Sequence, residues 1–153
     1  QLRAFGTQEG VRETRRIEGK NVLTAQELLA PAQFDDAIAA GAYPIDIHAA
    51  RGGGLHYQTL GDDHAYQIPY RSLIPTAFDN ALAVGRGVSA THAALAAIRV
   101  MTISMAVGQA AGTAAALATR RRPGSNHDGP ADVRAVPVAA LRRQLEKDGA
   151  CLR

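Results

Sequence analysis

Hydrophobic and polar positions follow several local patterns along this chain, and the clearest one lies past its middle. Residues 81–84 form a short apolar run that predicts a buried strand, and Gly85-Arg86-Gly87 follows as a turn. Residues 98–119 are rich in alanine and glycine, which predicts a long helix lined by small side chains. The first N–H groups of a helix lack partners within it, so its start can bind an anion or a polar ring edge. We therefore expect this strand, turn and helix to form one wall of a cofactor pocket.

The N-terminal part of the chain predicts shorter elements. A strand-like alternation bounded by turn residues extends over residues 10–19, with Arg12 and Arg16 on one face. Thr24 is followed three residues later by Glu27, which is the spacing of a capping box and predicts a short helix. Leu23 and Leu28 are placed to form a hydrophobic staple around that helix start.

The middle of the chain reads as turns, loops and short strands. Pro31 limits the first helix to a short one, and residues 34–40 predict another helical turn, closed by Gly41. Residues 43–75 predict loops and short strands, including the flexible glycine triplet at residues 52–54. Pro69 and Pro75 flank YRSLI, which suits an edge strand or an extended active-site segment. Residues 138–148 predict a final amphipathic helix that Gly149 ends.

Composition narrows the class of protein. A chain of 153 residues fits one ordinary domain, and 46% hydrophobic with 20% charged residues is globular. Aromatic residues are only 5% and tryptophan is absent, which argues against a nucleic-acid binder that stacks bases. The net charge of +3 gathers in two spots, Arg15-Arg16 and Arg120-Arg121-Arg122, which suit an anionic ligand or solubility equally well.

Cysteine, histidine and the chain start carry little information on compartment or metal. One cysteine allows no disulfide within the chain, and the five histidines show no HxxxH spacing, so we expect no metal site. The first residues lack the pattern of a signal peptide. The compartment stays open.

The long predicted helix also resembles a membrane span in length. Gly108 and Gly112 form a GxxxG motif, which can mark a transmembrane dimer in an apolar segment. However, the segment contains Thr102, Ser104 and Gln109, and most of its apolar residues are alanine. The pattern therefore favours a helix buried against a sheet over a membrane span.

Two kinds of side chain are candidates for chemistry. His48 ends an apolar alternation, which is typical of a hydrogen-bonded residue at a strand end and less often of a proton donor or acceptor. Six arginines lie in apolar or glycine-rich settings, where each needs an anionic partner: Arg12, Arg15, Arg16, Arg71, Arg86 and Arg99. The partner is either a carboxylate such as Glu13 or Asp46, or an anionic substrate or cofactor.

Several blocks in order resemble one family. GVRETRRIEG, LTAQEL, YPIDIH, IPYRSLIP and NALAVGRGVSATHAALAAIRVMTISMAVGQAAGTAAALA are similar to the C-terminal half of FAD-dependent oxidoreductases of the FAD/NAD(P)-binding Rossmann-like group. The resemblance runs over residues 10–118, and VPVAALRRQLEKDGA fits the family's terminal helix. It implies an α/β fold, or α+β for this part alone. Residues 1–75 would belong to a substrate-side domain, 76–122 to the FAD-binding domain, and 123–153 to a linker and final helix.

The resemblance also implies residue roles. The cofactor set would be Gly85 and Arg86 near the ribityl chain and residues near the isoalloxazine, namely Arg99, Val100, Met101, Thr102 and Ile103. Arg12 and Arg16 would bind substrate, His48 would transfer a proton, and Arg71 would position the substrate for hydride transfer to the flavin.

One departure limits what this chain is expected to do alone. The family's GxGxxG turn, which holds the FAD pyrophosphate, is missing, and so is the acidic ribose-binding residue that follows it. We therefore expect a C-terminal part that retains FAD poorly and needs an N-terminal FAD-binding half or self-association, with a small-molecule substrate. The alternative is a non-catalytic part that associates through an exposed apolar face.

Overall fold

The computed structural model describes residues 3–4, 7, 10–30, 32–48, 54–61, 63–120 and 131–152. The expectations for Pro31, the glycines at 52–53, and Arg121 with Arg122 lie outside these residues.

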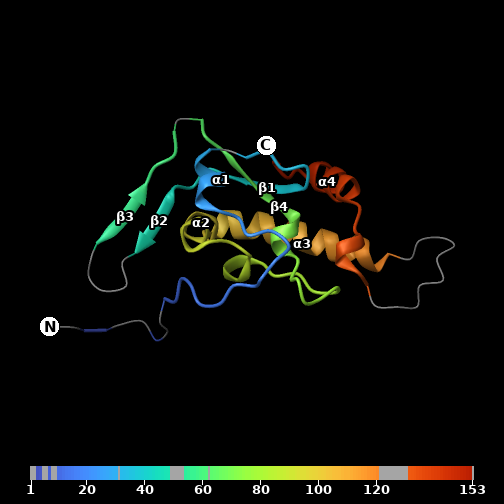
Figure 1. Cartoon of the computed structure of the whole chain (residues 1–153), viewed down its shortest axis with the longest axis horizontal. Helices are drawn as coiled ribbons and strands as arrows, with labels where there is room; N and C mark the ends of the chain where they lie inside the picture. The colour runs from blue at the N-terminus through green and yellow to red at the C-terminus, as the bar shows by residue number, and fades with distance from the viewer. Residues whose placement is uncertain are drawn as a thin grey trace.

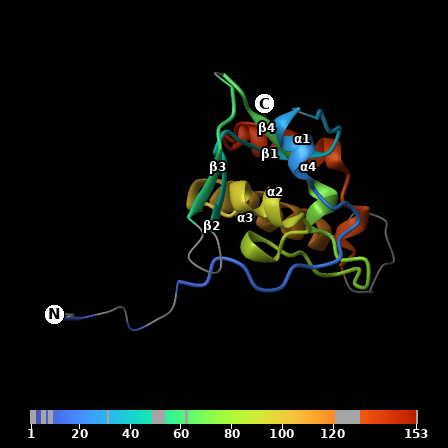
Figure 2. The ribbon, with the colours of Figure 1, turned by 60° about the vertical axis from the view of Figure 1, so that its left-hand side comes forward.

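Helices and short antiparallel strands make up the described chain (Figures 1 and 2). The elements in order are α1 (Ala25–Leu29), β1 (Ala37–Gly41), β2 (Ile45–His48), β3 (Leu55–Gln58), β4 (Tyr66–Pro69), η1 (Tyr70–Leu73), η2 (Gly85–Gly87), α2 (His92–Ile98), α3 (Met101–Thr119), η3 (Val133–Ala135) and α4 (Val138–Lys147). β1 pairs with β4 and β2 pairs with β3, both antiparallel. This arrangement is α+β.

The central helix α3 packs against β1, α4, η2 and η3. Figure 1 shows the β1–β4 pair and α4 on one side of α3 and η2 on the other. One apolar core joins the chain from Leu23 to Leu152, with Tyr66 and Leu95 fully buried between them. This core includes residues from all three segments that the sequence predicted, 1–75, 76–122 and 123–153. Their assignment to separate domains of a whole protein therefore stays a prediction.

Two sequence predictions are confirmed in detail. Thr24 caps α1, since its hydroxyl accepts from the Glu27 N–H and the Glu27 carboxylate accepts from the Thr24 N–H. α4 has Leu141 and Leu145 fully buried on one face, and Gly149 follows it with a φ of 85°.

The predicted strand at 10–19 and the predicted turn at 34–40 are wrong. Residues 10–18 run without regular structure, because no neighbouring strand lies along them: Ile17 donates to the Gly87 carbonyl, and Gly19 forms an isolated bridge with Pro75. Residues 37–41 are the strand β1, because β4 offers a partner and pairing with it outweighs the high helix propensity of the alanines.

The segments around the predicted cofactor wall also differ from expectation. YRSLI forms the buried 3-10 helix η1 instead of an edge strand. Residues 81–84 are not a strand, since no described strand pairs with them; the Ala83 N–H donates to the Leu73 carbonyl, and the Val84 carbonyl accepts from the Gly87 N–H. The helix expected at 98–119 begins at Met101, because Val100 is extended, with φ −70° and ψ 155°, and separates α3 from α2.

Candidate functional site

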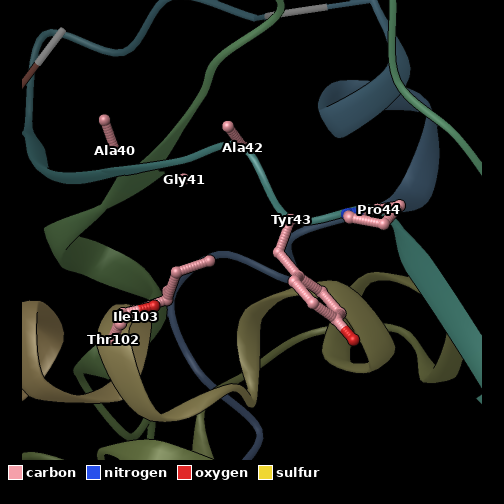
Figure 3. A pocket seen from close by; sticks show the side chains of 7 residues that line it. All are labelled: Ala40, Gly41, Ala42, Tyr43, Pro44, Thr102 and Ile103. Atoms are coloured by element: carbon pink, nitrogen blue, oxygen red, sulfur yellow. The ribbon is translucent and has the colours of Figure 1, made fainter.

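A pocket opens beside the start of α3. It encloses about 420 Å³ and is lined by residues 40–44 together with Thr102 and Ile103. Figure 3 shows Ile103 and the Tyr43 ring on the helix side of the segment that leaves β1. The neighbouring residue Tyr66 fixes this segment, because its hydroxyl donates to the Tyr43 carbonyl at 3.1 Å. Burial raises the pKa of Tyr66, so the hydroxyl stays protonated as that donor.

The start of α3 has free hydrogen-bond donors. Val100 gives it no side-chain cap, and the first bond of the helix runs from the Ser104 N–H to the Val100 carbonyl. The N–H groups of Met101, Thr102 and Ile103 therefore have no bond among the described residues. Such donors, with the positive end of the helix dipole, favour an anion or an electron-rich ring edge.

The turn η2 packs against α3, as the predicted pairing of these two segments requires. Gly85 adopts a φ of 60°, a conformation that side-chain-bearing residues rarely take, so glycine is favoured there. Arg86 is exposed, and it forms no ion pair within the described part of the chain. It is the cofactor candidate left open to a ligand.

Residues 85–90 have the G-x-G-x-x-A spacing of a dinucleotide-binding turn, a variant of GxGxxG that ends in alanine. The local structure differs from that motif. No strand precedes Gly85, and α2 begins only at His92 behind its cap Thr91. This turn lacks the strand–turn–helix context that presents a pyrophosphate to a helix start.

Arg99 is turned toward β2. Its guanidinium donates to the Asp46 carbonyl at 3.0 Å and lies 3.8 Å from Asp46 Oδ2. Both side chains are only 14% exposed. Asp46 is therefore the partner of Arg99 among the described residues, and a role of Arg99 toward the cofactor stays a prediction.

His48 is bound to the same carboxylate. Its Nε2 lies 3.2 Å from Asp46 Oδ2 with hydrogen-bond geometry, and 3.0 Å from Oδ1 without it. Sequence reasoning treated Asp46 only as a partner for arginine. The Asp-x-His spacing was the missed signal, since alternate residues of a strand lie on one face.

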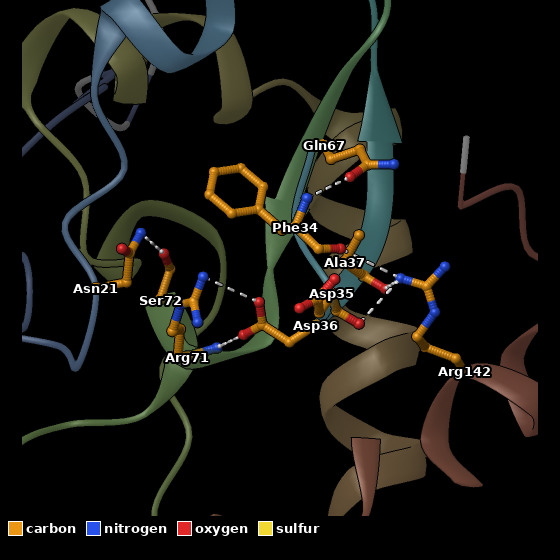
Figure 4. A network of polar contacts seen from close by, with 9 residues as sticks. All are labelled: Asn21, Phe34, Asp35, Asp36, Ala37, Gln67, Arg71, Ser72 and Arg142. Atoms are coloured by element: carbon orange, nitrogen blue, oxygen red, sulfur yellow. Dashed lines mark hydrogen bonds and ion pairs between the residues drawn. The ribbon is translucent and has the colours of Figure 1, made fainter. Parts of the chain in front are cut away.

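Arg71 lies in a different polar network, at the start of β1 (Figure 4). Its N–H donates to Asp36 Oδ2 at 3.0 Å, and its guanidinium is 3.4 Å from Oδ1 and 5.8 Å from the centre of the Phe34 ring. Arg142, from α4, donates to the Ala37 carbonyl at the same strand. Arg71 lies beside the β1–β4 pair, whereas His48 lies on β2, which pairs with β3. No hydrogen bond or ion pair joins the two side chains.

The two N-terminal arginines also differ from each other. Arg16 forms an ion pair with Glu13, and Glu13 in turn lies 2.5 Å from His92 Nδ1 at the start of α2. Arg12 is exposed and has no ion pair among the described residues. The Glu13 contacts fasten the N-terminal segment to α2.

One face of α3 is left uncovered. We call this the outer face; its residues are Met101, Met105, Gly108, Gly112 and Ala116. Met101 and Met105 are 83% and 73% exposed, and a methyl group on either glycine would touch nothing within 4 Å. The GxxxG motif therefore points away from the core, contrary to the expectation of a buried helix.

By length and composition alone, α3 is the one helix of the described residues that would be able to cross a membrane. A single such helix is weak evidence, because soluble core helices pass the same test. No group of three potential metal-ligating side chains gathers anywhere in the residues that the structure describes.

The fold is α+β, and the uncapped start of α3 lies beside a pocket. The sequence matches the family FAD dependent oxidoreductase over residues 1–145, and the chain belongs to this family. It is thus related to flavoproteins that use FAD for oxidation and reduction. Neither the curated proteins nor the solved structures contain a match to this chain.

Proposed function

We propose that this chain supplies the isoalloxazine side of the flavin pocket and part of the substrate site of an FAD-dependent oxidoreductase. The observation that carries the proposal is the uncapped start of α3, which borders a pocket. The same helix packs against the glycine turn η2. The chain would represent the last part of a Rossmann-like FAD domain together with part of a substrate domain.

The residues present fit the ring end of FAD. The N–H groups of Met101, Thr102 and Ile103 would face the ring edge that becomes negative on reduction, and a helix start stabilises such charge. Arg86, exposed on the turn η2 that packs against α3, would meet the ribityl or pyrophosphate part. When bound, FAD supplies the hydride acceptor.

Substrate handling is proposed for residues outside that helix. His48 would accept or return a proton of a small organic substrate, and the half-exposed Arg71 would position an anionic group of it. Arg12 is free to bind an anion, whereas Arg16 already holds Glu13 and would need to release it. The chain alone would retain FAD poorly, because it lacks the pyrophosphate-binding GxGxxG turn.

The test joins this chain to a GxGxxG-bearing N-terminal half of an FAD-dependent oxidoreductase by co-expression. We expect one bound flavin per complex, visible by its absorbance. Met101→Pro is the discriminating variant, because proline is tolerated at the first helical position but removes one N–H donor. It should weaken flavin binding roughly 10-fold, the effect of one hydrogen bond to a charged group. Met101→Ala keeps the N–H and is the matched control.

A complex without flavin would refute the proposal. Equal binding by the proline and alanine variants would refute the part assigned to the start of α3.

A second candidate function is association without catalysis. It is supported by the outer face of α3, a 19-residue helix that carries no charged side chain yet exposes two methionines. The partner would be the N-terminal half or a second copy of this chain. Light scattering after size exclusion tests it, since a monomer at all concentrations with no partner bound would argue against association.

A further inference from the structure

Asp46, predicted from the sequence only as a possible counter-ion of an arginine, contacts the imidazole of His48 as well. Asp46 and His48 are two positions apart on β2 and therefore lie on the same face of the strand. Both carboxylate oxygens approach His48 Nε2, at 3.0 and 3.2 Å. The imidazole is thus held at one of its two nitrogens.

Asp46 itself is fixed more firmly than a surface residue. Its side chain is 14% exposed, and Oδ1 is buried without a bond of hydrogen-bond geometry in the described residues. Arg99, equally shielded, binds the Asp46 carbonyl from the junction of α2 and α3. A carboxylate this shielded holds a hydrogen-bonded imidazole in one orientation and sets which ring nitrogen carries the proton.

The other side of the imidazole is open. The His48 side chain is 45% exposed, and no described residue forms a hydrogen bond or ion pair with its Nδ1. A nitrogen bound to a carboxylate keeps its proton, which leaves the lone pair on the other nitrogen. The ring therefore has one anchored nitrogen and one that is accessible from solvent.

We propose that Asp46 is the positioning residue for His48, holding Nε2–H so that Nδ1 exchanges the proton with substrate. The proposal rests on the proposed function only for the identity of that reaction. A substrate O–H or N–H bond breaks, its proton joins the Nδ1 lone pair, and the charge of the imidazolium is balanced by the Asp46 carboxylate. Arg99 connects this pair to the start of α3, so one carboxylate ties the proton site to the predicted flavin site.

The test needs no flavin and uses the chain by itself. Nuclear magnetic resonance of histidine labelled with 15N and 13C reports which ring nitrogen carries the proton and how freely each ring moves. We expect the neutral form of the His48 ring to carry its proton on Nε2, and the ring to move no more than the backbone beside it. His56, exposed on β3 and without a side-chain bond in the described residues, is the internal reference for a mobile ring.

Variants separate positioning from general folding. Asp46→Ala should release the ring of His48 to the mobility of His56, and Asp46→Asn, which keeps the side-chain volume, should release it in part. Asp132→Ala removes another arginine-bound carboxylate and should leave His48 unchanged.

Three results would overturn the proposal. The first is a His48 proton mainly on Nδ1, and the second is a His48 ring as mobile as that of His56 in the unmodified chain. The third is a His48 ring that stays as ordered in both Asp46 variants as in the unmodified chain. Loss of flavin binding in the co-expressed complex concerns the proposed function instead, so the two failures are distinguishable.

Discussion

Gly41 and Ile103 are in such close contact that a methyl group on Gly41 would lie 2.7 Å from Ile103 Cδ1. The same methyl group would lie 2.6 Å from the Tyr66 ring. Gly41 ends β1, and Ile103 lies in the first turn of α3. The absence of a side chain at this point therefore allows the start of α3 to approach the strand and to border the pocket.

Gly41→Ala should destabilise the fold by about 1–3 kcal/mol, because Ile103 and Tyr66 are both buried and have little room to move. Urea unfolding followed by circular dichroism measures this. Gly108→Ala is the matched control, since its added methyl group meets nothing and should stabilise the helix by roughly 0.5–1 kcal/mol. An unchanged midpoint for Gly41→Ala would mean that α3 does not approach β1 as described.

The sequence predicted the elements whose signals are local. The capping box at Thr24 and the amphipathic helix at Val138–Lys147 depend on neighbours a few residues away, and both are confirmed. Residues 37–41 were misread, because their strand depends on β4, which lies far along the chain. The break at Val100 was likewise invisible, since nothing in an alanine-rich run marks one extended residue.

In the candidate site, too, some features could be predicted from the sequence and others depended on tertiary contacts. The resemblance spanning whole blocks predicted that the glycine turn lies near the long helix, and η2 does pack against α3. The partners of Arg71 and Arg99 depended on tertiary structure: Asp36 and Asp46 are each far from their arginines in sequence. Single-residue chemistry predicted that a carboxylate was one possible partner, and only the fold decided which one.

Tyr70 gives the protein a pH dependence on the alkaline side. Burial, aided by the negative charge of Asp132, raises the pKa of Tyr70 to about 12, and its hydroxyl donates to the Val133 carbonyl at 2.8 Å. The unfolded chain loses this proton near pH 10. Between these values the folded state binds more protons, so stability is complete below pH 10 and falls as the pH rises toward 12.

Tyr70→Phe should therefore cost about 0.5–1.5 kcal/mol at neutral pH, through the lost hydrogen bond. At about pH 11 the difference from the unmodified chain should shrink, because phenylalanine has no proton to lose. Urea unfolding at the two pH values measures it. A constant difference would show that Tyr70 ionises alike in both states.

The outer face of α3 should tolerate charge in the isolated chain but not in a complex. Met105→Glu alters a side chain that is 73% exposed, so we expect the unfolding free energy to change by less than about 0.5 kcal/mol. The same change should abolish binding to the N-terminal half or self-association, since a buried carboxylate without a partner is costly. Val22→Glu, at another exposed apolar residue, is the control. Binding by Met105→Glu equal to the control would exclude the outer face as the interface.

Arg99 joins β2 to the helices, and its replacement should lower the free energy of unfolding through its effect on Asp46. Arg99→Gln removes the bond to the Asp46 carbonyl and the nearby positive charge, leaving a carboxylate that is 14% exposed with less compensation. We expect a cost of about 1–3 kcal/mol in urea unfolding. The double variant with Asp46→Asn should cost less than the sum of the two single changes, because the poorly compensated charge is then gone. Strict additivity would mean that Arg99 stabilises the fold independently of Asp46.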